Sequence, residues 1–378
     1  MTSDRLVVHT RVVTGAGGGP EKTIINSPRF LQHRGYPMLC AYMRAPEDAG
    51  FKALLTRAQK AGATILPVDD NGPLDWRIAR RFKTICEQHR PALWHAHDYK
   101  SNFYGLLATR SVPMKLITTA HGYVEKTWKT PVYYGLDRFV LKRYDHVICV
   151  SEDLREFMLD RGIAPERCTY IPNGIDTDEY RRTEPSEAAK KRAGVPDGRL
   201  VFGAVGRLSA EKGFDLALRA FASVLASTQV DAEFWIAGVG PEEVRLKQLI
   251  GELGLGDRAK LIGFRSDIHE LFSAMDGFLL SSLREGIPNV VLEAMAMEVP
   301  LVCTKVAGVP NVIDDEKEGL LVDCGSADAI IPALTRLVTD AELRSRLVAQ
   351  ARQRVESRHS FSLRMERIKQ VYDQVCEA

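Results

Sequence analysis

Short apolar segments alternate with longer amphipathic segments along most of this 378-residue sequence. The strand candidates lie at 6–8, 64–66, 92–95, 116–119, 146–150, 200–205, 233–237, 259–261, 277–280, 300–303 and 319–321. Helical periodicity is expected near 22–33, 49–60, 73–89, 101–110, 132–143, 213–226, 241–253, 268–275, 290–297 and 328–338. Strands separated by helices form βαβ units, whose parallel sheets are covered by helices on both faces. The expected fold class is therefore α/β.

The strongest interruption of this alternation is the segment 178–196, which is charged and poor in apolar residues. A fresh strand candidate follows it at once, so we predict an interdomain linker there. Each side then has about the size of one doubly wound domain, in keeping with the two or three domains expected from chain length.

Composition excludes several classes of protein. The chain is 45% hydrophobic and 26% charged, unlike disordered or collagenous sequences. No apolar run approaches the ~18 residues of a membrane-spanning helix, and the N-terminal segment is too charged for a secretory leader. The seven cysteines are scattered and form no C-x-x-C pair, which favours a reducing cytoplasm over disulfides or a zinc ribbon.

The net charge of +2 conceals an uneven distribution. Residues 1–182 contain 27 Lys and Arg against 20 Asp and Glu, so the remainder has 51 − 27 = 24 against 49 − 20 = 29. Basic residues gather at 77–83, and again with aromatic residues at 126–143. These clusters indicate either a solvated face or peripheral contact with anionic membrane. Nucleic acid is not an expected partner, because no recognition motif accompanies the basic residues.

Two loops that follow strand candidates could bind an anion. The first, TGAGGGP at 14–20, allows close backbone approach but lacks the glycine spacing of a dinucleotide fingerprint. The second, GRLSAEKG at 206–213, is no P-loop but offers Arg207 and Lys212, which can both bind phosphate. Flexible or solvated turns are the structural alternatives in both cases.

A third loop, SSLREGIPNVVLEAMAM at 281–297, leads from a strand candidate into a helix. Pro288 suits the first helical position, and the N–H groups of Asn289 and Val290 would then be free to bind an anion. Glu285 and Glu293 flank this helix start. They could accept hydrogen bonds from sugar hydroxyls, or simply complement the helix dipole.

Together these motifs resemble the large retaining glycosyltransferase family 4, also called group 1. Its E-x7-E signature is similar to EGIPNVVLE at 285–293, and its donor-phosphate loop is similar to GRLSAEKG. IPNGID at 171–176 and LIGFR at 261–265 follow the family's order, as does the first glycine-rich loop followed by Glu21. The resemblance runs over essentially the whole chain. It implies the GT-B architecture, with two Rossmann-like doubly wound parallel-sheet domains facing a central cleft.

The resemblance also implies the division of the chain and the reaction. An N-terminal acceptor-binding domain would comprise 1–182 plus a crossover helix at 360–378, and a nucleotide-sugar-binding domain would comprise 183–359. The enzyme would be a metal-independent hexosyltransferase that uses a nucleotide-diphosphate sugar as co-substrate and needs no cofactor. UDP-sugar and GDP-sugar both remain open as donors. The acceptor would be a glycan or a lipid-linked molecule, used in cell-surface polysaccharide or glycoconjugate synthesis.

Site roles follow from the same resemblance. Catalytic roles fall to His121, Arg207, Lys212 and Glu285. Donor-binding roles fall to Gly18, Gly19, Asn173, Gly206, Arg207, Lys212, Phe264, Arg265, Ile268, Glu285, Gly286, Ile287, Pro288, Asn289, Val290 and Glu293. His97 and Asp98 are assigned to an acceptor pocket.

Other interpretations remain open. His95 and His97 lie on one face of a strand candidate and could bind a metal, but no third ligand is evident in the sequence, so no metal site is predicted. A nucleotide-sugar 2-epimerase or hydrolase could share the architecture, and its product would form without an acceptor. A nucleotide-binding scaffold protein should lack some of the five key residues His121, Arg207, Lys212, Glu285 and Glu293, and all five are present. The expected location is the cytoplasm, with the inner face of the cytoplasmic membrane as an alternative.

Overall fold

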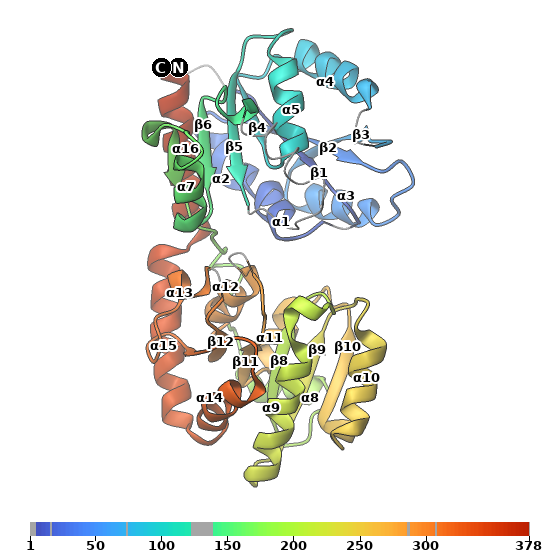
Figure 1. Ribbon diagram of the computed structural model, residues 1–378, viewed down its shortest axis with the longest axis vertical. Helices are drawn as coiled ribbons and strands as arrows, with labels where there is room; N and C mark the ends of the chain where they lie inside the picture. Colours follow the sequence, from blue (N-terminus) through green and yellow to red (C-terminus); the bar gives the residue numbers. More distant parts are fainter. Residues whose placement is uncertain are drawn as a thin grey trace. The chain divides into compact units, whose positions relative to one another are not determined.

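The chain divides into two compact units, each built around its own parallel sheet (Figure 1). The computed structural model describes residues 5–15, 17–72, 75–121, 139–285, 288–306 and 308–377. Unit 1 comprises Met1–Pro172 and Ser362–Ala378, and unit 2 comprises Asn173–Phe361. The predicted α/β class with parallel sheets is confirmed in both units.

Unit 1 contains a seven-stranded sheet in the order β3-β2-β1-β4-β5-β6-β7. Its strands are β1 (Val7–Val12), β2 (Met38–Arg44), β3 (Thr64–Asp69), β4 (Leu93–Ala96), β5 (Lys115–Ala120), β6 (His146–Cys149) and β7 (Cys168–Tyr170). Its helices are α1 (Gly19–Asn26), α2 (Pro28–Leu31), α3 (Phe51–Lys60), α4 (Trp76–His89), α5 (Tyr99–Ala108), α7 (Glu152–Leu159) and α16 (Phe361–Glu377). The order reverses direction between β1 and β4, which makes that pair the topological switch point, where ligands of such sheets bind.

Unit 2 contains a six-stranded sheet in the order β10-β9-β8-β11-β12-β13. Its strands are β8 (Leu200–Val205), β9 (Ala232–Ala237), β10 (Ala259–Gly263), β11 (Gly277–Leu280), β12 (Leu301–Thr304) and β13 (Leu320–Val322). Its helices are α8 (Ser186–Arg192), α9 (Phe214–Ser227), α10 (Glu243–Glu252), α11 (Ile268–Ala274), α12 (Asn289–Ala296), α13 (Val309–Val312), α14 (Ala327–Thr339) and α15 (Ala341–Arg358). Here the switch point is the pair β8 and β11.

The central strands of unit 2 are buried because helices cover both faces of its sheet. All six residues of β9 are buried, and Phe278 and Leu279 on β11 pack into the two different clusters that lie on opposite faces of the sheet. The polar loops at the carboxyl edge are therefore held by rigid strands. Among the described residues, no helix is long and apolar enough to cross a bilayer.

The segment 178–196 is not a linker in the structure. It contains α8, and Tyr180, Ala189 and Val195 are buried in a core cluster of unit 2. Lys190 forms an ion pair with Asp276, with Nζ and Oδ2 2.5 Å apart. The segment was expected to be a linker because it is highly charged, but its buried apolar residues and the Lys190–Asp276 ion pair attach it to unit 2.

Arg182 also attaches this segment to the rest of unit 2. Its guanidinium donates hydrogen bonds to the carbonyl oxygens of Phe272, Ser273, Met275 and Met297 at 3.0–3.3 Å. Those carbonyls lie at the ends of α11 and α12, so one side chain joins both helices to the segment.

We expect Arg182→Leu to lower the free energy of unfolding by about 2–3 kcal/mol, because it removes charged donors from several partly buried carbonyls. The exposed neighbour Arg181 provides the control, and Arg181→Leu should change stability by less than ~0.5 kcal/mol. Urea denaturation of both variants measures the difference. Equal losses would show that Arg182 does not anchor the segment.

Candidate functional site

The loops of unit 2 that were predicted to bind a donor meet at the β8/β11 switch point. Gly206–Gly213 follows β8, and Ser281 and Ser282 follow β11. Because β8 and β11 are adjacent parallel strands, their carboxyl ends bring these distant loops together.

An ion pair joins the two loops. Lys212 Nζ lies 2.5 Å from Glu285 Oε1, and the Ser282 hydroxyl donates to the same carboxylate oxygen at 2.7 Å. The two charged side chains are 21% and 10% exposed, so they are shielded without being sealed from solvent. Two of the four predicted catalytic residues are therefore held together, and Lys212 keeps further N–H donors beyond this pair.

Hydrogen bonds to backbone carbonyls hold the two loops together around this ion pair. Ser281 Oγ donates to the carbonyl of Lys212 at 2.9 Å, and Leu283 N donates to the carbonyl of Glu211 at 2.8 Å. Gly213 has a φ of +60°, and a Cβ added there would lie 2.3 Å from Ser281 O. Only glycine permits this approach of the two loops.

The start of α12 completes this edge of unit 2. The helix begins at Asn289, so Pro288 is the residue before the helix and not its first residue as predicted. A proline ring favours extended backbone as readily as helix, and here ψ of 113° places Pro288 outside the helix. Glu293 is buried on α12, and the Oδ1 atom of Asn289 is buried without a hydrogen-bond partner among the described residues. Val290 packs against the core of unit 2. Gly286 and Ile287 lie outside the described residues.

The other predicted donor residues of unit 2 are more exposed. Arg207 is exposed beside Gly206, and Phe264 is 71% exposed. Arg265 forms an ion pair with Asp267, and Ile268 begins α11 half-buried. Asn173 is half-buried, with its carbonyl oxygen 3.4 Å from His359 Nδ1.

In unit 1, the glycine-rich loop is tied to a buried carboxylate. Gly18 N donates to Glu21 Oε2 at 2.6 Å, and Arg11 forms an ion pair with the same carboxylate. Gly19 is the first residue of α1. The predicted Gly18 and Gly19 thus lie at a helix start beside the end of β1.

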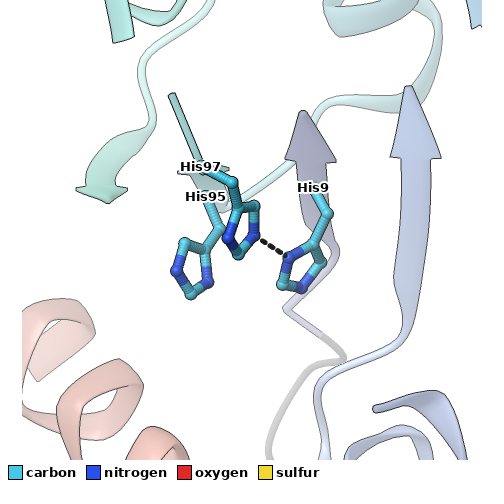
Figure 2. A group of neighbouring side chains, drawn as sticks. All are labelled: His9, His95 and His97. Carbon is cyan, nitrogen blue, oxygen red and sulfur yellow. Dashed lines mark hydrogen bonds between the residues drawn. The ribbon is translucent and has the colours of Figure 1, made fainter. Parts of the chain in front are cut away.

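A chain of histidines lies at the β1/β4 switch point (Figure 2). His9 Nδ1 is 2.9 Å from His97 Nε2, and His97 Nδ1 is 3.1 Å from His121 Nε2. His95 contacts the hydroxyls of Tyr372 and Thr119, each at 2.7 Å. Burial lowers the pKa of His9 to about 3 and holds the pKa values of His95, His97 and His121 well below 6.5. These rings are therefore neutral at physiological pH.

The sequence interpretation missed His9. His9, His95 and His97 have ligand atoms within 4.8 Å of one another, so a third potential metal ligand does exist. A lone histidine in a strand gives no sequence signal, and His9 reaches His95 only because their residues are paired in the parallel register of β1 and β4.

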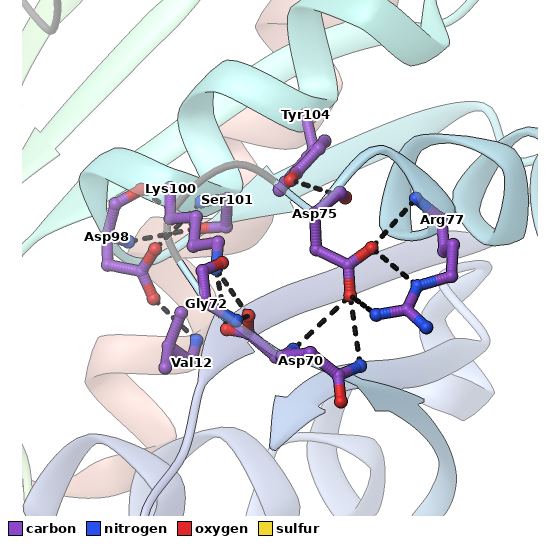
Figure 3. Close-up of polar contacts among 10 residues, drawn as sticks. Val12, Asp70, Gly72, Asp75, Arg77, Asp98, Lys100, Ser101 and Tyr104 are labelled. Carbon is purple, nitrogen blue, oxygen red and sulfur yellow. Dashed lines mark hydrogen bonds and ion pairs between the residues drawn. The ribbon is translucent and has the colours of Figure 1, made fainter. Parts of the chain in front are cut away.

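Asp98, assigned to an acceptor pocket, makes structural hydrogen bonds (Figure 3). Its carboxylate accepts hydrogen bonds from the backbone N–H groups of Val12 and Ser101, each at 2.7 Å, so it joins the end of β1 to the start of α5. Nearby, Lys100 Nζ lies 2.6 Å from Asp70 and 2.7 Å from the Gly72 carbonyl oxygen. Asp98 thus positions the loop that holds His97.

Two family models cover most of this chain. Residues 17–179 match the model described as Glycosyltransferase Family 4, and residues 185–354 match the model described as Glycosyl transferases group 1. The chain belongs to the group 1 glycosyltransferases.

Relatives and solved structures agree with that membership. The chain is 28% identical over 298 residues, 76% of each protein, to the UDP-Gal:alpha-D-GlcNAc-diphosphoundecaprenol alpha-1,3-galactosyltransferase of Escherichia coli. It is 29% identical over 323 residues, 80% of this chain and 82% of the relative, to the alpha-D-kanosaminyltransferase of Streptomyces kanamyceticus. HepE of Anabaena, crystallised in complex with UDP-glucose, has a TM-score of 0.82 at 22% identity, covering 98% of this chain and 99% of HepE.

This glycosyltransferase therefore has the predicted GT-B fold and is an enzyme of the transferase class. Both named relatives are transferases, so they lend no support to the epimerase alternative.

The buried histidines predict a pH dependence of the glycosyltransferase's stability. Their folded-state pKa values are lowered, so the unfolded state binds more protons below about pH 6.5. Stability should be complete above pH 6.5 and fall as pH decreases from there, with each neutral histidine contributing up to ~1.4 kcal/mol per pH unit. Urea denaturation between pH 7 and pH 5 measures this slope. His9→Leu should flatten it by one such contribution, and the exposed His89→Leu should leave it unchanged. Identical slopes for wild type and His9→Leu would contradict the burial argument.

Proposed function

We propose that this protein is a retaining, metal-independent glycosyltransferase that transfers a hexose-type sugar from a nucleotide-diphosphate sugar to a glycan or lipid-linked acceptor. The pathway would be the synthesis of cell-surface polysaccharide or glycoconjugate. The observation that carries the proposal is the Lys212–Glu285 ion pair at the β8/β11 switch point. A cation and a carboxylate held side by side can bind a phosphate and a sugar hydroxyl of one donor.

The leaving group needs charge stabilisation. The bond between the anomeric carbon and the β-phosphate oxygen breaks, and its electron pair stays with the diphosphate. Lys212 and the exposed Arg207 would hold this developing charge, with help from the N–H groups at the start of α12. The acceptor hydroxyl attacks the same face, and its proton passes to the departing phosphate oxygen. Fixed protein cations would thus take the place of a metal ion.

The remaining polar groups suit the rest of the donor. Glu293 would accept hydrogen bonds from the ribose hydroxyls, and Glu285 would accept one from a hexose hydroxyl. His121 would accept a hydrogen bond from a second sugar hydroxyl. Phe264, Arg265 and Ile268 would line the base pocket. UDP is the nucleotide we favour, because the E. coli relative is named for UDP-Gal and HepE was crystallised with UDP-glucose.

A lipid-linked acceptor would place the enzyme at the inner face of the cytoplasmic membrane. The E. coli relative is named for a diphosphoundecaprenol acceptor. On α4, Trp76 is 65% exposed and Arg80 and Arg81 are exposed, while Ile78 and Phe82 are buried. An exposed tryptophan beside exposed arginines suits an anionic membrane surface. Most of the second basic-aromatic segment, residues 122–138, lies outside the described residues.

The reaction is tested with a panel of UDP-, GDP- and ADP-sugars. A thermal shift identifies the donor, since a ligand that binds the folded state raises its stability. The selected α-linked donor is then incubated in EDTA with a synthetic GlcNAc-diphospholipid, and the product is analysed by proton NMR. We expect an α-linked product in EDTA. A β-linked product would contradict retention, and loss of transfer in EDTA with recovery on adding a divalent cation would contradict metal independence.

Membrane contact is tested separately by flotation with vesicles containing anionic lipid at low salt. Wild type should float, and Arg80→Glu/Arg81→Glu should float less. Arg192, which is ion-paired with Glu184 and Glu270 in unit 2, supplies the control Arg192→Glu. Absence of wild-type binding would reject the membrane proposal without affecting transfer to a soluble acceptor.

A further inference from the structure

The direction of the hydrogen bonds along the histidine chain of unit 1 follows from where the Tyr372 hydroxyl places its hydrogen. Tyr372 Oη lies 2.7 Å from His95 Nδ1 and 3.5 Å from His9 Nε2. A phenol has one hydrogen and both contacts are imidazole nitrogens, so we place the hydrogen on the shorter contact, to His95 Nδ1. His95 then carries its hydrogen on Nε2 and donates it to Thr119 Oγ1 at 2.7 Å.

The remaining protons follow in sequence. The phenol oxygen, its hydrogen used, faces His9 Nε2 as an acceptor, so His9 carries its hydrogen there. His9 Nδ1 is then bare and accepts the Nε2–H of His97 at 2.9 Å. His97 Nδ1 is bare in turn and accepts the Nε2–H of His121 at 3.1 Å. Each neutral ring has only one N–H, so each choice fixes the next.

Two features keep the chain neutral. The rings of His9, His95 and His97 are buried, and the positive charges of Arg11 and Arg364 act on His121. Among the described residues, no carboxylate is hydrogen-bonded to these rings, so an added proton has no counter-charge. The chain therefore suits orientation of a neutral ring better than conduction of a proton.

We propose that His9 and Tyr372 are positioning residues that hold His121 as its Nε2–H tautomer, so that His121 Nδ1 accepts a hydroxyl hydrogen of the substrate sugar. This inference rests on the sugar-binding role proposed for His121. It gives a role to His9 and Tyr372, which act on His121 through His97.

A metal at His9, His95 and His97 is the competing interpretation of the same cluster. A metal would have to displace hydrogen bonds that these rings already make, including both bonds of His95. His95 and His97 also stack with their rings 4.4 Å apart and 20° from parallel, which directs their in-plane lone pairs alongside one another instead of toward one point. The hydrogen-bonded chain is therefore the better account.

Three variants separate positioning from packing. His9→Leu removes the acceptor of the His97 Nε2–H. His97 should then carry its hydrogen on Nδ1 and donate to His121 Nε2, because a buried N–H without a partner is costly. His9→Asn keeps an acceptor oxygen near the position of Nδ1. Tyr372→Phe removes one hydroxyl and little volume, so it tests the same control of the His121 tautomer if His9→Leu fails to fold.

The readout is the tautomer of His121, observed by long-range ¹⁵N–¹H NMR of the full-length protein with ¹⁵N-labelled histidine and assigned with His121→Gln. Wild type and His9→Asn should show a bare Nδ1 and a protonated Nε2, and His9→Leu and Tyr372→Phe should show the reverse. Zinc chloride added to the NMR sample should leave the histidine signals unchanged, and a parallel ITC titration should show no stoichiometric zinc binding. A protonated Nδ1 in wild type, an unchanged tautomer in both His9→Leu and Tyr372→Phe, or stoichiometric zinc binding would each overturn the proposal.

Activity provides a second readout. His9→Leu should lower kcat/KM for the nucleotide sugar about tenfold, the cost of one misdirected hydrogen bond, and His9→Asn should recover most of it. If the tautomer changes as expected while even His121→Gln leaves turnover normal, the proposed role of His121 fails but the proton order in the chain stands. If His121→Gln is impaired and the tautomer does not respond to either variant, the positioning proposal alone fails.

Discussion

Lys212→Ala should lower kcat for sugar transfer by a factor of about 10²–10³, the effect of removing one charge-stabilising donor from a transition state. Lys212 is paired with Glu285, the carboxylate proposed to bind the sugar, with Nζ 2.5 Å from Glu285 Oε1. Its loss removes stabilisation of the departing diphosphate. It also leaves Glu285, only 10% exposed, with the Ser282 hydroxyl as its one remaining hydrogen-bond partner among the described residues, which raises the energy of the ionised carboxylate. Steady-state kinetics with the identified donor measure the effect.

Lys247 provides the matched control in the same unit. It also forms an ion pair, with Nζ 2.7 Å from Glu243, but its side chain is 62% exposed on α10. Lys247→Ala should therefore leave kcat within twofold of wild type. A Lys212→Ala enzyme that retains near-normal turnover would contradict the role of Lys212 in leaving-group stabilisation.

Gly213→Ala should destabilise unit 2 by about 3 kcal/mol or more and abolish donor binding. Gly213 has a φ of +60°, where an L-residue costs about 1–2 kcal/mol. The new Cβ would also lie 2.3 Å from Ser281 O, so the loops after β8 and β11 would have to separate. Since Ser281 Oγ binds the carbonyl of Lys212, that movement would displace Lys212 and Glu285 together.

Gly254 separates the two contributions. Its φ is +64°, nearly the same as at Gly213, but a Cβ added there would meet no heavy atom within 4 Å. Gly254→Ala should therefore cost only the backbone strain and leave donor binding intact. Urea denaturation and a donor thermal shift on both variants give the comparison. Equal losses of stability, with donor binding retained in Gly213→Ala, would show that the close approach of the loops is not required.

The sequence predicted every strand of unit 2, because most of them are short apolar runs, and four of the six have mainly buried side chains. β2 (Met38–Arg44) was missed since its sequence, MLCAYMR, contains no β-branched residue. Its conformation follows from pairing with β1 and β3 on either side, which are contacts that a sequence pattern does not display. The three-residue strand β7 was too short to recognise.

Helix α15 was missed for a different reason. Its buried residues are Leu343, Leu347, Ala351 and Val355, a narrow stripe with a spacing of four. The other positions are mostly charged or polar, so the stripe is too thin to stand out, and its packing against α12 and α14 supplies the rest of its stability.

In the candidate site, too, local motifs could be recognised in the sequence, but contacts between residues far apart in the chain could not. The contact between Lys212 and Glu285 could not be predicted from their spacing, because 73 residues separate them. Each residue was nevertheless identified by the motif in which it lies. The adjacency of β8 and β11 turns those two motifs into one site. His9 carried no motif at all, and only the register of β1 with β4 brings it beside His95.

The central claim is that the loops at the β8/β11 switch point bind the diphosphate of a nucleotide sugar without a metal. Isothermal titration calorimetry of UDP and GDP in EDTA tests it most directly, with wild type, Arg207→Ala and the exposed control Arg219→Ala on α9. We predict that wild type and Arg219→Ala bind one of the two nucleotides in EDTA, and that Arg207→Ala raises its Kd by about 10- to 100-fold. Failure of wild type to bind either nucleotide in EDTA, or an unchanged Kd in Arg207→Ala, would contradict the claim.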